Sequence, residues 1–227
     1  MYKKTLIPKY NNDNNNIEIG VDEAGRGPMF GRVYTASVIL PNDNFDFSLM
    51  KDSKKFTSKK KILEAYDYII NNALAWSVNW LDEKTIDEIN IRQSTLTSMH
   101  NSIHDIIDKY NIQYNEINDI NNFFLLIDGN DFKPYMIFEN DEYKCIDYTC
   151  IKGGDNTYCS IAAASILAKV ERDKYIEELC DKNPELQEKY KIRSNKGYGT
   201  KFHMDGIKKY GITQWHRKTY GICKMYA

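Results

Sequence analysis

Apolar residues form short runs along this chain, and five of these runs have the length and pattern of buried strands. Ile17, Ile19 and Val21 make up the first run, and Pro41 ends the second. The run at 123–127 is continuously apolar, which is typical of a strand covered on both faces. The predicted strands cover residues 17–21, 33–40, 73–80, 123–127 and 145–151.

Apolar residues at helical spacing separate these strands. Each predicted helix begins at a residue that favours helix starts, or ends at a glycine. The helix at 160–180 carries small residues, which allow close packing against a sheet. The predicted helices are one through 62–70 after Thr57 or Ser58, one at 83–110 after Asp82, one at 160–180 from Ser160, and one at 201–210 before Gly211.

Composition divides the chain into three predicted parts. Residues 11–16 are almost all Asn, which is typical of a flexible segment. Pro184 interrupts the helical pattern, and the sequence beyond it is rich in Lys and Arg. We therefore expect a flexible arm at 1–16, one main domain at 17–183, and a basic helical extension at 184–227.

The 227 residues suffice for one sizeable domain, and 42% hydrophobic with 28% charged residues is ordinary for a globular protein. No apolar run reaches membrane-spanning length, and residues 1–16 lack the apolar core of a signal peptide. The five cysteines have no CxxC spacing, so neither a disulfide framework nor a zinc ribbon is predicted. We expect a cytoplasmic protein with no membrane partner, or a nuclear one in a eukaryote.

Charge is distributed unevenly, although the formal net charge is only −1. Residues 191–227 contain nine Lys or Arg and one acid, whereas residues 82–147 contain fourteen acids and five bases. Two oppositely charged solvated surfaces would explain this pattern. It also suits a polyanionic partner whose phosphates contact the basic tail while some of the acids bind metal ions.

Acidic residues stand at the ends of three predicted strands. Asp22 and Glu23 follow the first, and Asp128 and Asp155 follow two later ones. Such acids can be ordinary turn residues, but ligands gather outside strand ends in α/β sheets. Four carboxylates there would repel one another unless divalent cations such as Mg²⁺ neutralise them, and two cations about 3.5–4 Å apart catalyse phosphodiester hydrolysis. Neighbouring strand residues point to opposite faces, so Asp22 and Glu23 can share a site only where the strand ends or bulges.

Three further motifs suggest ligands. The Gly-Arg-Gly turn at 25–27 can bring backbone N–H groups and a guanidinium to a phosphate. The lysine-rich segment 51–61 opposes the dipole of the helix that follows it, so it suits phosphate contact as well as simple solvation. His100 and His104 have the spacing of half a zinc site, but a complete site needs further ligands.

Seven stretches carry distinctive motifs: Gly-Val-Asp-Glu-Ala-Gly-Arg-Gly-Pro (20–28), Asp-Ser-Lys-Lys-Phe-Thr (52–57), Leu-Ile-Asp-Gly-Asn (126–130), Lys-Gly-Gly-Asp (152–155), Ser-Ile-Ala-Ala-Ala-Ser-Ile-Leu-Ala-Lys-Val-Glu-Arg-Asp (160–173), Lys-Gly-Tyr-Gly-Thr-Lys-Phe-His (196–203) and His-Arg-Lys-Thr-Tyr (216–220). Together, and in this order, they resemble the ribonuclease HII family, the type 2 ribonucleases H. The resemblance covers nearly the whole chain from Ile17 onward. It implies an RNase H-like α/β fold with a mixed five-stranded sheet flanked by helices and a small helical C-terminal extension.

The resemblance also implies an endonuclease that cleaves RNA in RNA–DNA hybrids and nicks duplex DNA 5′ of an embedded ribonucleotide, leaving 3′-hydroxyl and 5′-phosphate ends. It implies two Mg²⁺ or Mn²⁺ ions bound by Asp22, Glu23, Asp128 and Asp155. The expected partners are therefore RNA–DNA hybrids and ribonucleotide-containing duplex DNA, and the self-contained length favours a monomer. In the family the 25–27 turn reads the 2′-hydroxyl, which distinguishes RNA from DNA, and Tyr198 stacks at the ribose. The implied substrate contacts are Gly25, Arg26, Gly27, Lys54, Lys55, Ser160, Ser165 and Tyr198.

The chain departs from the family pattern in two places. Phe30 and Arg32 replace the small residue and the proline usual around Gly31, which predicts repacking beside the turn. Two glycines precede Asp155 where one is more common, so the direction of this carboxylate is open.

Other interpretations of the same residues remain. His203 and His216 are interpreted as structural or phosphate-facing, because Mg²⁺ and Mn²⁺ favour oxygen ligands. A catalytically inactive hybrid-binding module or a subunit of a repair complex is the main alternative to an enzyme, and the presence of all four acids favours the enzyme. A nuclease restricted to DNA would have no 2′-hydroxyl to sense. The sixteen residues before Ile17 are too few for the N-terminal domain of ribonuclease HIII.

Overall fold

The computed structural model describes residues 5–10, 16–114, 119–139 and 141–227. The predicted flexible arm therefore lies partly outside the described residues, and its segment 5–10 contacts the rest of the chain. The backbone N–H of Ile7 donates to the carbonyl of Thr157 at 2.8 Å, and the Tyr10 ring stacks on Phe124 with the centroids 5.7 Å apart. Within the described ranges, no helix is long and apolar enough to cross a membrane.

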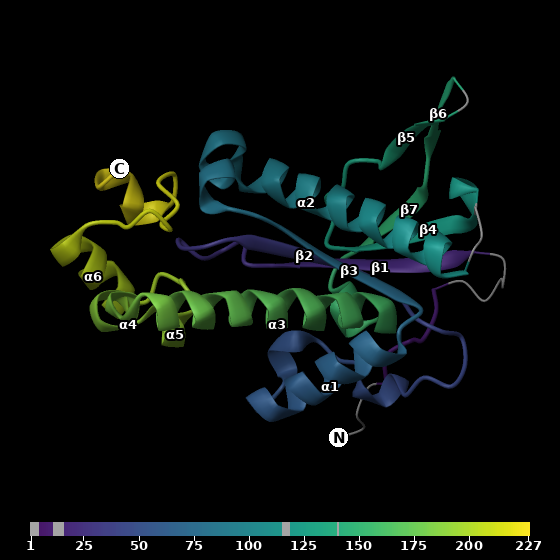
Figure 1. Cartoon of the computed structure of the whole chain (residues 1–227), viewed down its shortest axis with the longest axis horizontal. Helices are drawn as coiled ribbons and strands as arrows, with labels where there is room; N and C mark the ends of the chain where they lie inside the picture. Colours follow the sequence, from purple (N-terminus) through teal and green to yellow (C-terminus); the bar gives the residue numbers. More distant parts are fainter. Residues whose placement is uncertain (1–4, 11–15, 115–118, 140) are drawn as a thin grey trace.

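A mixed five-stranded sheet forms the centre of the molecule (Figure 1). Its strand order is β3-β2-β1-β4-β7, so the first strand of the chain lies in the middle. β1 is antiparallel to β2 and parallel to β4, and β4 is parallel to β7, which confirms the α/β fold and the mixed sheet. The strands are β1 (Ile17–Ala24), β2 (Val33–Ile39), β3 (Ala75–Leu81), β4 (Phe123–Asp128) and β7 (Asp147–Ile151).

Helices cover both faces of this sheet, with α1 and α3 on one face and α2 on the other (Figure 1). The first face buries residues such as Ile69 and Ala163, and the second buries residues such as Ile19 and Ile103. Ser58 begins α1, because its hydroxyl accepts the N–H of the third helical residue at 3.3 Å. The helices are α1 (Lys59–Asn72), α2 (Glu83–Tyr114) and α3 (Cys159–Lys182).

The small residues of α3 bring this helix very close to β1. Gly20 faces the backbone of Ser160, and a β-carbon at Gly20 would lie 2.2 Å from the carbonyl carbon of Ser160. No real β-carbon comes that near another carbon, so only glycine fits this position of the strand. The close packing places the end of β1 directly beside the middle of α3.

The long helix α2 begins as predicted but is not continuous. The Asp82 carboxylate accepts the N–H of Thr85 at 2.8 Å, which is the geometry of a helix start. At Asn90 the backbone has φ 66° and ψ 162°, which are not helical values. The Asn90 side chain then accepts the N–H of Gln93 at 3.1 Å and so begins the second part of the helix. The prediction of one uninterrupted helix was wrong at this residue.

The predicted strand at 145–151 is in fact divided. Ile146 is fully buried, and its N–H donates to the Tyr135 carbonyl at 3.2 Å, which separates β6 from β7. β6 pairs with another strand in a two-stranded hairpin that projects from the body of the molecule (Figure 1). The sequence analysis did not predict this hairpin. Its strands are β5 (Met136–Glu139) and β6 (Glu142–Cys145).

The C-terminal part consists of short helices that pack against the far end of α3 (Figure 1). Phe30, Ile176, Leu186 and Ile207 lie in one apolar cluster, so this part shares a core with α3 and with the turn after β1. Because this cluster includes residues from both sides of position 183/184, the domain boundary predicted there stays a prediction. The helices here are α4 (Pro184–Tyr190), α5 (Ile192–Asn195), α6 (Lys201–Tyr210) and the 3₁₀ turn Gly221–Met225; earlier 3₁₀ turns are Phe47–Leu49, Ser53–Lys55, Ile120–Asn122 and Gly154–Asn156.

Candidate active site

The four predicted acids come from three neighbouring strands. Asp22 and Glu23 lie at the end of β1, Asp128 is the last residue of β4, and Asp155 lies in the 3₁₀ turn after β7. Because these three strands are parallel neighbours, their ends meet at one edge of the sheet. The N–H of Gly154 donates to the Asp128 carboxylate at 2.7 Å, which joins the last two strand ends directly.

The carboxylates at this edge disfavour one another's charge. Burial, followed by the charges of Glu23 and Asp128, raises the pKa of Asp22 well above its ordinary value. Burial also raises the pKa of Glu23, in spite of the opposing charge of Arg26. Burial and the charge of a fifth acid, Asp52, raise the pKa of Asp155, and Asp128 adds to this effect. The edge is therefore a place where positive charge would be stabilised.

Asp22 and Glu23 do belong to opposite faces of the strand, as the alternation rule requires. Asp22 is on the α3 side and only 5% exposed, and a hydrogen bond from the Ser165 hydroxyl favours its charged form. Glu23 lies at the rim of the sheet, where its carboxylate is 3.4 Å from the Arg26 guanidinium. Both still act electrostatically on each other and on Asp128, because the strand ends here.

The donor set suits a hard divalent cation, since every member is a carboxylate oxygen. Among the described residues, however, no group of three or more His, Cys, Asp or Glu side chains is arranged to hold a metal ion. The acids thus form an electrostatic cluster and not a preassembled coordination shell. Their chemistry and their raised pKa values fit such a cation.

A cleft of about 570 Å³ opens beside Glu23. It brings together the 25–27 turn, Lys54, Ser165 and Tyr198, which the sequence analysis predicted to contact substrate. A β-carbon at Gly27 would lie 3.4 Å from the Tyr198 ring, so the turn and the tyrosine are adjacent. Tyr198 is 51% exposed, which leaves its ring open to a ligand. The other residues that line the cleft are Ala24, Ser53, Lys169, Arg172, Asp173, Ser194, Asn195 and Lys196.

Two lysines of the 51–61 segment lie on the acidic side of the cleft. Burial alone would lower the pKa of Lys54, but the charges of Asp155 and Asp22 outweigh it and hold that pKa above its ordinary value. The ammonium group of Lys55 donates to the side-chain oxygen of Asn156, the residue after Asp155. Lys54 therefore stays charged, and both lysines lie next to the carboxylate cluster.

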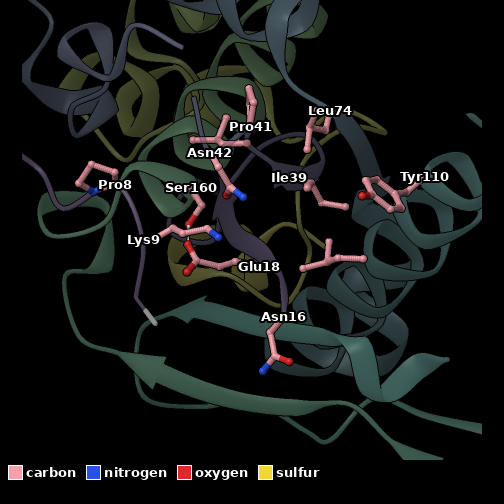
Figure 2. Close-up of a pocket in the computed structure, with 12 residues that line it drawn as sticks. Pro8, Lys9, Asn16, Glu18, Ile39, Pro41, Asn42, Leu74, Tyr110 and Ser160 are labelled. Atoms are coloured by element: carbon pink, nitrogen blue, oxygen red, sulfur yellow. Dashed lines mark hydrogen bonds between the residues drawn. The ribbon is translucent and has the colours of Figure 1, made fainter. Parts of the chain in front are cut away.

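Lys55 and Ser160 are the predicted substrate contacts that do not line the cleft. Ser160 lines a different pocket. It is 1% exposed, and its hydroxyl donates to the Glu18 carboxylate at 2.8 Å. Figure 2 shows it with Glu18, Lys9 and Asn42 around a separate pocket of about 190 Å³ near the start of β1. The tight packing of α3 on β1 fixes Ser160 there, so the geometry gives its predicted role no support.

Asp52 was missed as a site residue, although it opens one of the matched motifs. Its carboxylate accepts the N–H of Lys54 at 2.9 Å and the Asn156 amide at 3.1 Å. Asn156 in turn donates to Asp155 at 3.2 Å. Asp52 therefore connects the lysine segment to the acid cluster. Its place at the start of the matched motif 52–57 is the sequence signal that could have found it.

The departures from the family pattern have structural reasons. The Arg32 guanidinium lies between two rings, 3.5 Å from the Trp80 centroid and 4.4 Å from the Tyr175 centroid. Of the two glycines before Asp155, Gly153 has φ 69°, which is the left-handed region. A β-carbon at Gly154 would lie 2.4 Å from the Ile161 side chain. Gly153 is therefore favoured by the backbone conformation, and Gly154 is required because there is no room for a side chain.

The histidines of α2 do not form half a zinc site. The His100 Nε2 atom is 2.7 Å from the Lys133 carbonyl oxygen, and the His104 Nδ1 atom is 3.1 Å from the Tyr135 hydroxyl. Both rings tie the helix to the loop that follows β4.

Comparison with known proteins agrees with this geometry. The family model for ribonuclease HII matches residues 19–223. The ribonuclease HII of Phocaeicola vulgatus is 40% identical over 217 residues, which are 96% of this chain and 94% of that protein. The ribonuclease HII of Cytophaga hutchinsonii is 41% identical over 204 residues, which are 90% of this chain and 89% of that protein.

Solved structures show the same fold. The crystal structure of ribonuclease H2 from Pyrococcus horikoshii OT3 aligns with a TM-score of 0.63 at 23% identity, over 92% of this chain and 96% of that chain. The structure of Bst-RNase HIII in complex with Mn²⁺ aligns with a TM-score of 0.61 at 18% identity, over 87% of this chain and 63% of that chain. At these identities the likeness concerns the fold alone.

Proposed function

Because this chain belongs to the ribonuclease HII family and is thus a type 2 ribonuclease H, we propose that it cleaves RNA in RNA–DNA hybrids and nicks duplex DNA 5′ of an embedded ribonucleotide. The products would carry 3′-hydroxyl and 5′-phosphate ends. One observation supports this most: a single cleft brings Glu23, from the acidic sheet edge, together with the 25–27 turn and Tyr198. A ribose bound at the turn and Tyr198 would therefore place its phosphodiester next to Glu23, which neighbours the other acids at the sheet edge.

Asp22, Glu23, Asp128 and Asp155 are the residues that would hold Mg²⁺ or Mn²⁺ in this proposal. When bound, such ions supply positive charge that stabilises the attacking and leaving oxygens. A Mn²⁺ complex of the related Bst-RNase HIII supports this choice of metal. Until an ion arrives, Lys54 partly balances the carboxylates, since its raised pKa reflects their charge.

The remaining cleft residues bind and orient the substrate. Tyr198 offers an exposed ring face, and Gly27 beside it has no side chain, so a sugar can lie on the ring against the turn backbone. The Ser165 hydroxyl lies 2.9 Å from that of Ser53, and both line the cleft with Lys54. We assign these three residues to the phosphate that flanks the ribose. Backbone and phosphate contacts position the duplex, while the turn reads the 2′-hydroxyl.

A cleavage assay on matched variants tests the proposal. Asp128→Asn should lower metal-dependent nicking of a duplex with one ribonucleotide by about a hundredfold or more, because it removes a charge from the metal cluster. Duplex binding should persist. Asp108→Asn makes the same change at an exposed position of α2 and should leave activity as it is.

Two results would contradict the proposal. If folded wild-type protein binds the duplex but cuts neither a single-ribonucleotide duplex nor a long RNA–DNA hybrid, the hybrid-binding module is the correct interpretation. If the wild-type protein cuts long hybrids but does not nick at single ribonucleotides, the proposed metal site still holds. The ribose-sensing role proposed for the 25–27 turn and Tyr198 would then be wrong.

A further inference from the structure

A buried arginine holds the 25–27 turn from behind. Arg217 is fully buried, and its guanidinium donates to the backbone carbonyls of Gly25 at 2.6 Å, Arg26 at 3.0 Å, Pro28 at 2.7 Å and Gly31 at 2.9 Å. A guanidinium is planar and rigid, so carbonyls bound to one fork are fixed relative to each other. The turn therefore presents its cleft side in one conformation.

A line of hydrogen bonds through two buried histidines ends at the other recognition residue. The His203 Nδ1 atom is 2.9 Å from the Tyr198 carbonyl oxygen, and its Nε2 atom is 3.0 Å from the Nε2 atom of His216. The His216 Nδ1 atom is 2.9 Å from the backbone nitrogen of Thr213.

The direction of this line follows from its two ends. A carbonyl only accepts and a backbone N–H only donates, so His203 carries its proton on Nδ1 and His216 on Nε2. The Thr213 hydroxyl is also 2.9 Å from the His216 Nδ1 atom and can donate to it, so every ring nitrogen has at least one complementary partner. Both rings are buried and neutral, since burial lowers the pKa of His203 and lowers that of His216 to about 3. The Tyr198 carbonyl is thus held by a fully satisfied chain of donors.

The arginine contacts and the hydrogen-bond line both include residues of the segment 213–217. His216 and Arg217 are adjacent, and the N–H of Arg217 donates to the Met29 carbonyl at 2.8 Å. The N–H of Met29 donates to the Gly197 carbonyl at 2.9 Å, directly before Tyr198. Phe30 fills the space between them, with its ring centroid 5.0 Å from that of His216. The segment 213–217 therefore contacts the backbone on both sides of the cleft's recognition end.

We propose that Arg217 and the His216–His203 pair are positioning residues that fix the spacing between the 25–27 turn and Tyr198, and thereby the discrimination of ribose from deoxyribose. The inference rests on the proposed function and deepens it. None of the three side chains lines the cleft, so they act on substrate only through the backbone they hold. A displacement of about 1 Å at a recognition element can cost about a hundredfold in rate.

The first test is Arg217→Lys, which keeps the positive charge but cannot bind this set of carbonyls. We expect kcat on a single-ribonucleotide duplex to fall by about tenfold or more, while the affinity for a duplex, held by phosphate contacts, changes by less than about threefold. The ratio of cleavage at a ribonucleotide to cleavage of an all-DNA duplex should fall as well. Arg92→Lys makes the same change at an exposed ion pair of α2 that lies outside the cleft, so it is the control and should match the wild type.

The second test uses the two nitrogens of His203. In His203→Asn the amide nitrogen can take the place of Nδ1 and still donate to the Tyr198 carbonyl. In His203→Gln the amide reaches toward His216, and the bond to Tyr198 is lost. Asn should therefore restore most of the activity that Gln loses, with a difference of about tenfold in kcat. A purely structural role would make the two variants lose activity in proportion to their thermal stability.

Each outcome decides the proposal. If Arg217→Lys is unfolded at the assay temperature, the comparison of Asn with Gln at 203 decides alone. If the variants are folded and keep the wild-type kcat and the wild-type discrimination of ribose from deoxyribose, the inference is wrong. The proposed function then still holds, provided that the wild-type enzyme cuts at the ribonucleotide. Absence of ribonucleotide-dependent cutting by the wild type would instead remove the proposed function itself.

Discussion

At the residue scale, the Asp22 carboxylate shows a conflict between stability and function. It is almost fully buried, beside Glu23 and Asp128, and its pKa is raised by burial and by both charges. Such a residue destabilises the protein without a cation and serves function when a cation is bound. Active sites commonly sacrifice stability in this way.

Asp22→Asn should therefore stabilise the metal-free protein near neutral pH. Because the folded-state pKa of Asp22 is raised, the cost of its charge appears as pH rises above the ordinary value and disappears at low pH, where the wild type is protonated. We expect about 1 kcal/mol, or a rise in Tm of about 2–4 °C, at pH 7.5 and no gain near pH 4. Thermal unfolding in chelator measures it, with Asp108→Asn as control. A fall in Tm at pH 7.5 would contradict the account.

His216 gives a second prediction, with the opposite pH dependence. Its pKa is about 3 in the folded protein and about 6.5 when unfolded, so the unfolded chain takes up a proton as pH falls below 6.5. Stability should fall with pH in this window, and His216 should account for about 2 kcal/mol between pH 7 and 5. Urea unfolding at both pH values measures this loss. His216→Gln should remove it, and an unchanged difference between pH 7 and 5 in that variant would exclude this explanation.

At the scale of elements, the contact between β1 and α3 positions the site. Gly20 has no room for a side chain against Ser160, and two residues later Asp22 receives a hydrogen bond from Ser165. The close packing of helix and strand is thus the reason why the acid and the hydroxyl meet.

Gly20→Ala should displace α3 from the sheet. The added carbon would lie 2.2 Å from the Ser160 backbone, so we expect a loss of about 3 kcal/mol in the free energy of unfolding. Gly199→Ala is the matched control, because its added carbon would meet only the flexible Met29 side chain at 3.3 Å. Denaturant unfolding of both variants provides the measurement. Equal stabilities would show that α3 can move without cost.

The elements that the sequence predicted well are those whose own residues determine them. The buried strands, the Ser58 and Asp82 helix starts and the small-residue helix α3 follow from local pattern. The break at Asn90 did not, because an Asn in the left-handed region is specified by the contacts around it. The β5–β6 hairpin exposes Met136, Phe138 and Tyr143, so its apolar residues do not mark strands of a buried sheet. Ile146, which divides β6 from β7, reads locally as one more strand residue.

Candidate site residues were predictable for a different reason. The acids, the 25–27 turn and Tyr198 stand in matched motifs. The structure places the acids at neighbouring strand ends, and Glu23, the turn and Tyr198 line one cleft. Ser160 stands in a motif as well, but its position on the buried first turn of α3 is a matter of packing. The tasks of Arg217 and Asp52 depend on partners far away in the sequence, so no local pattern could show them.

At the scale of the whole molecule, the cleft lies where the sheet edge meets the C-terminal part. Glu23 comes to the cleft from the sheet edge, while Tyr198 and Lys196 come from the basic end of the chain. Some of the basic charge is already used, since Lys196 lies 3.2 Å from Glu177 and Arg193 pairs with Asp181.

The central claim is that this cavity joins metal-dependent hydrolysis to recognition of one ribose. Mapping the cut in a DNA duplex with a single ribonucleotide, at nucleotide resolution and with Mg²⁺, Mn²⁺ or chelator, tests it most directly. We predict one metal-dependent cut immediately 5′ of the ribonucleotide and no cut in the all-DNA duplex. A cut at another position, or an equal cut in the all-DNA duplex, would contradict the claim.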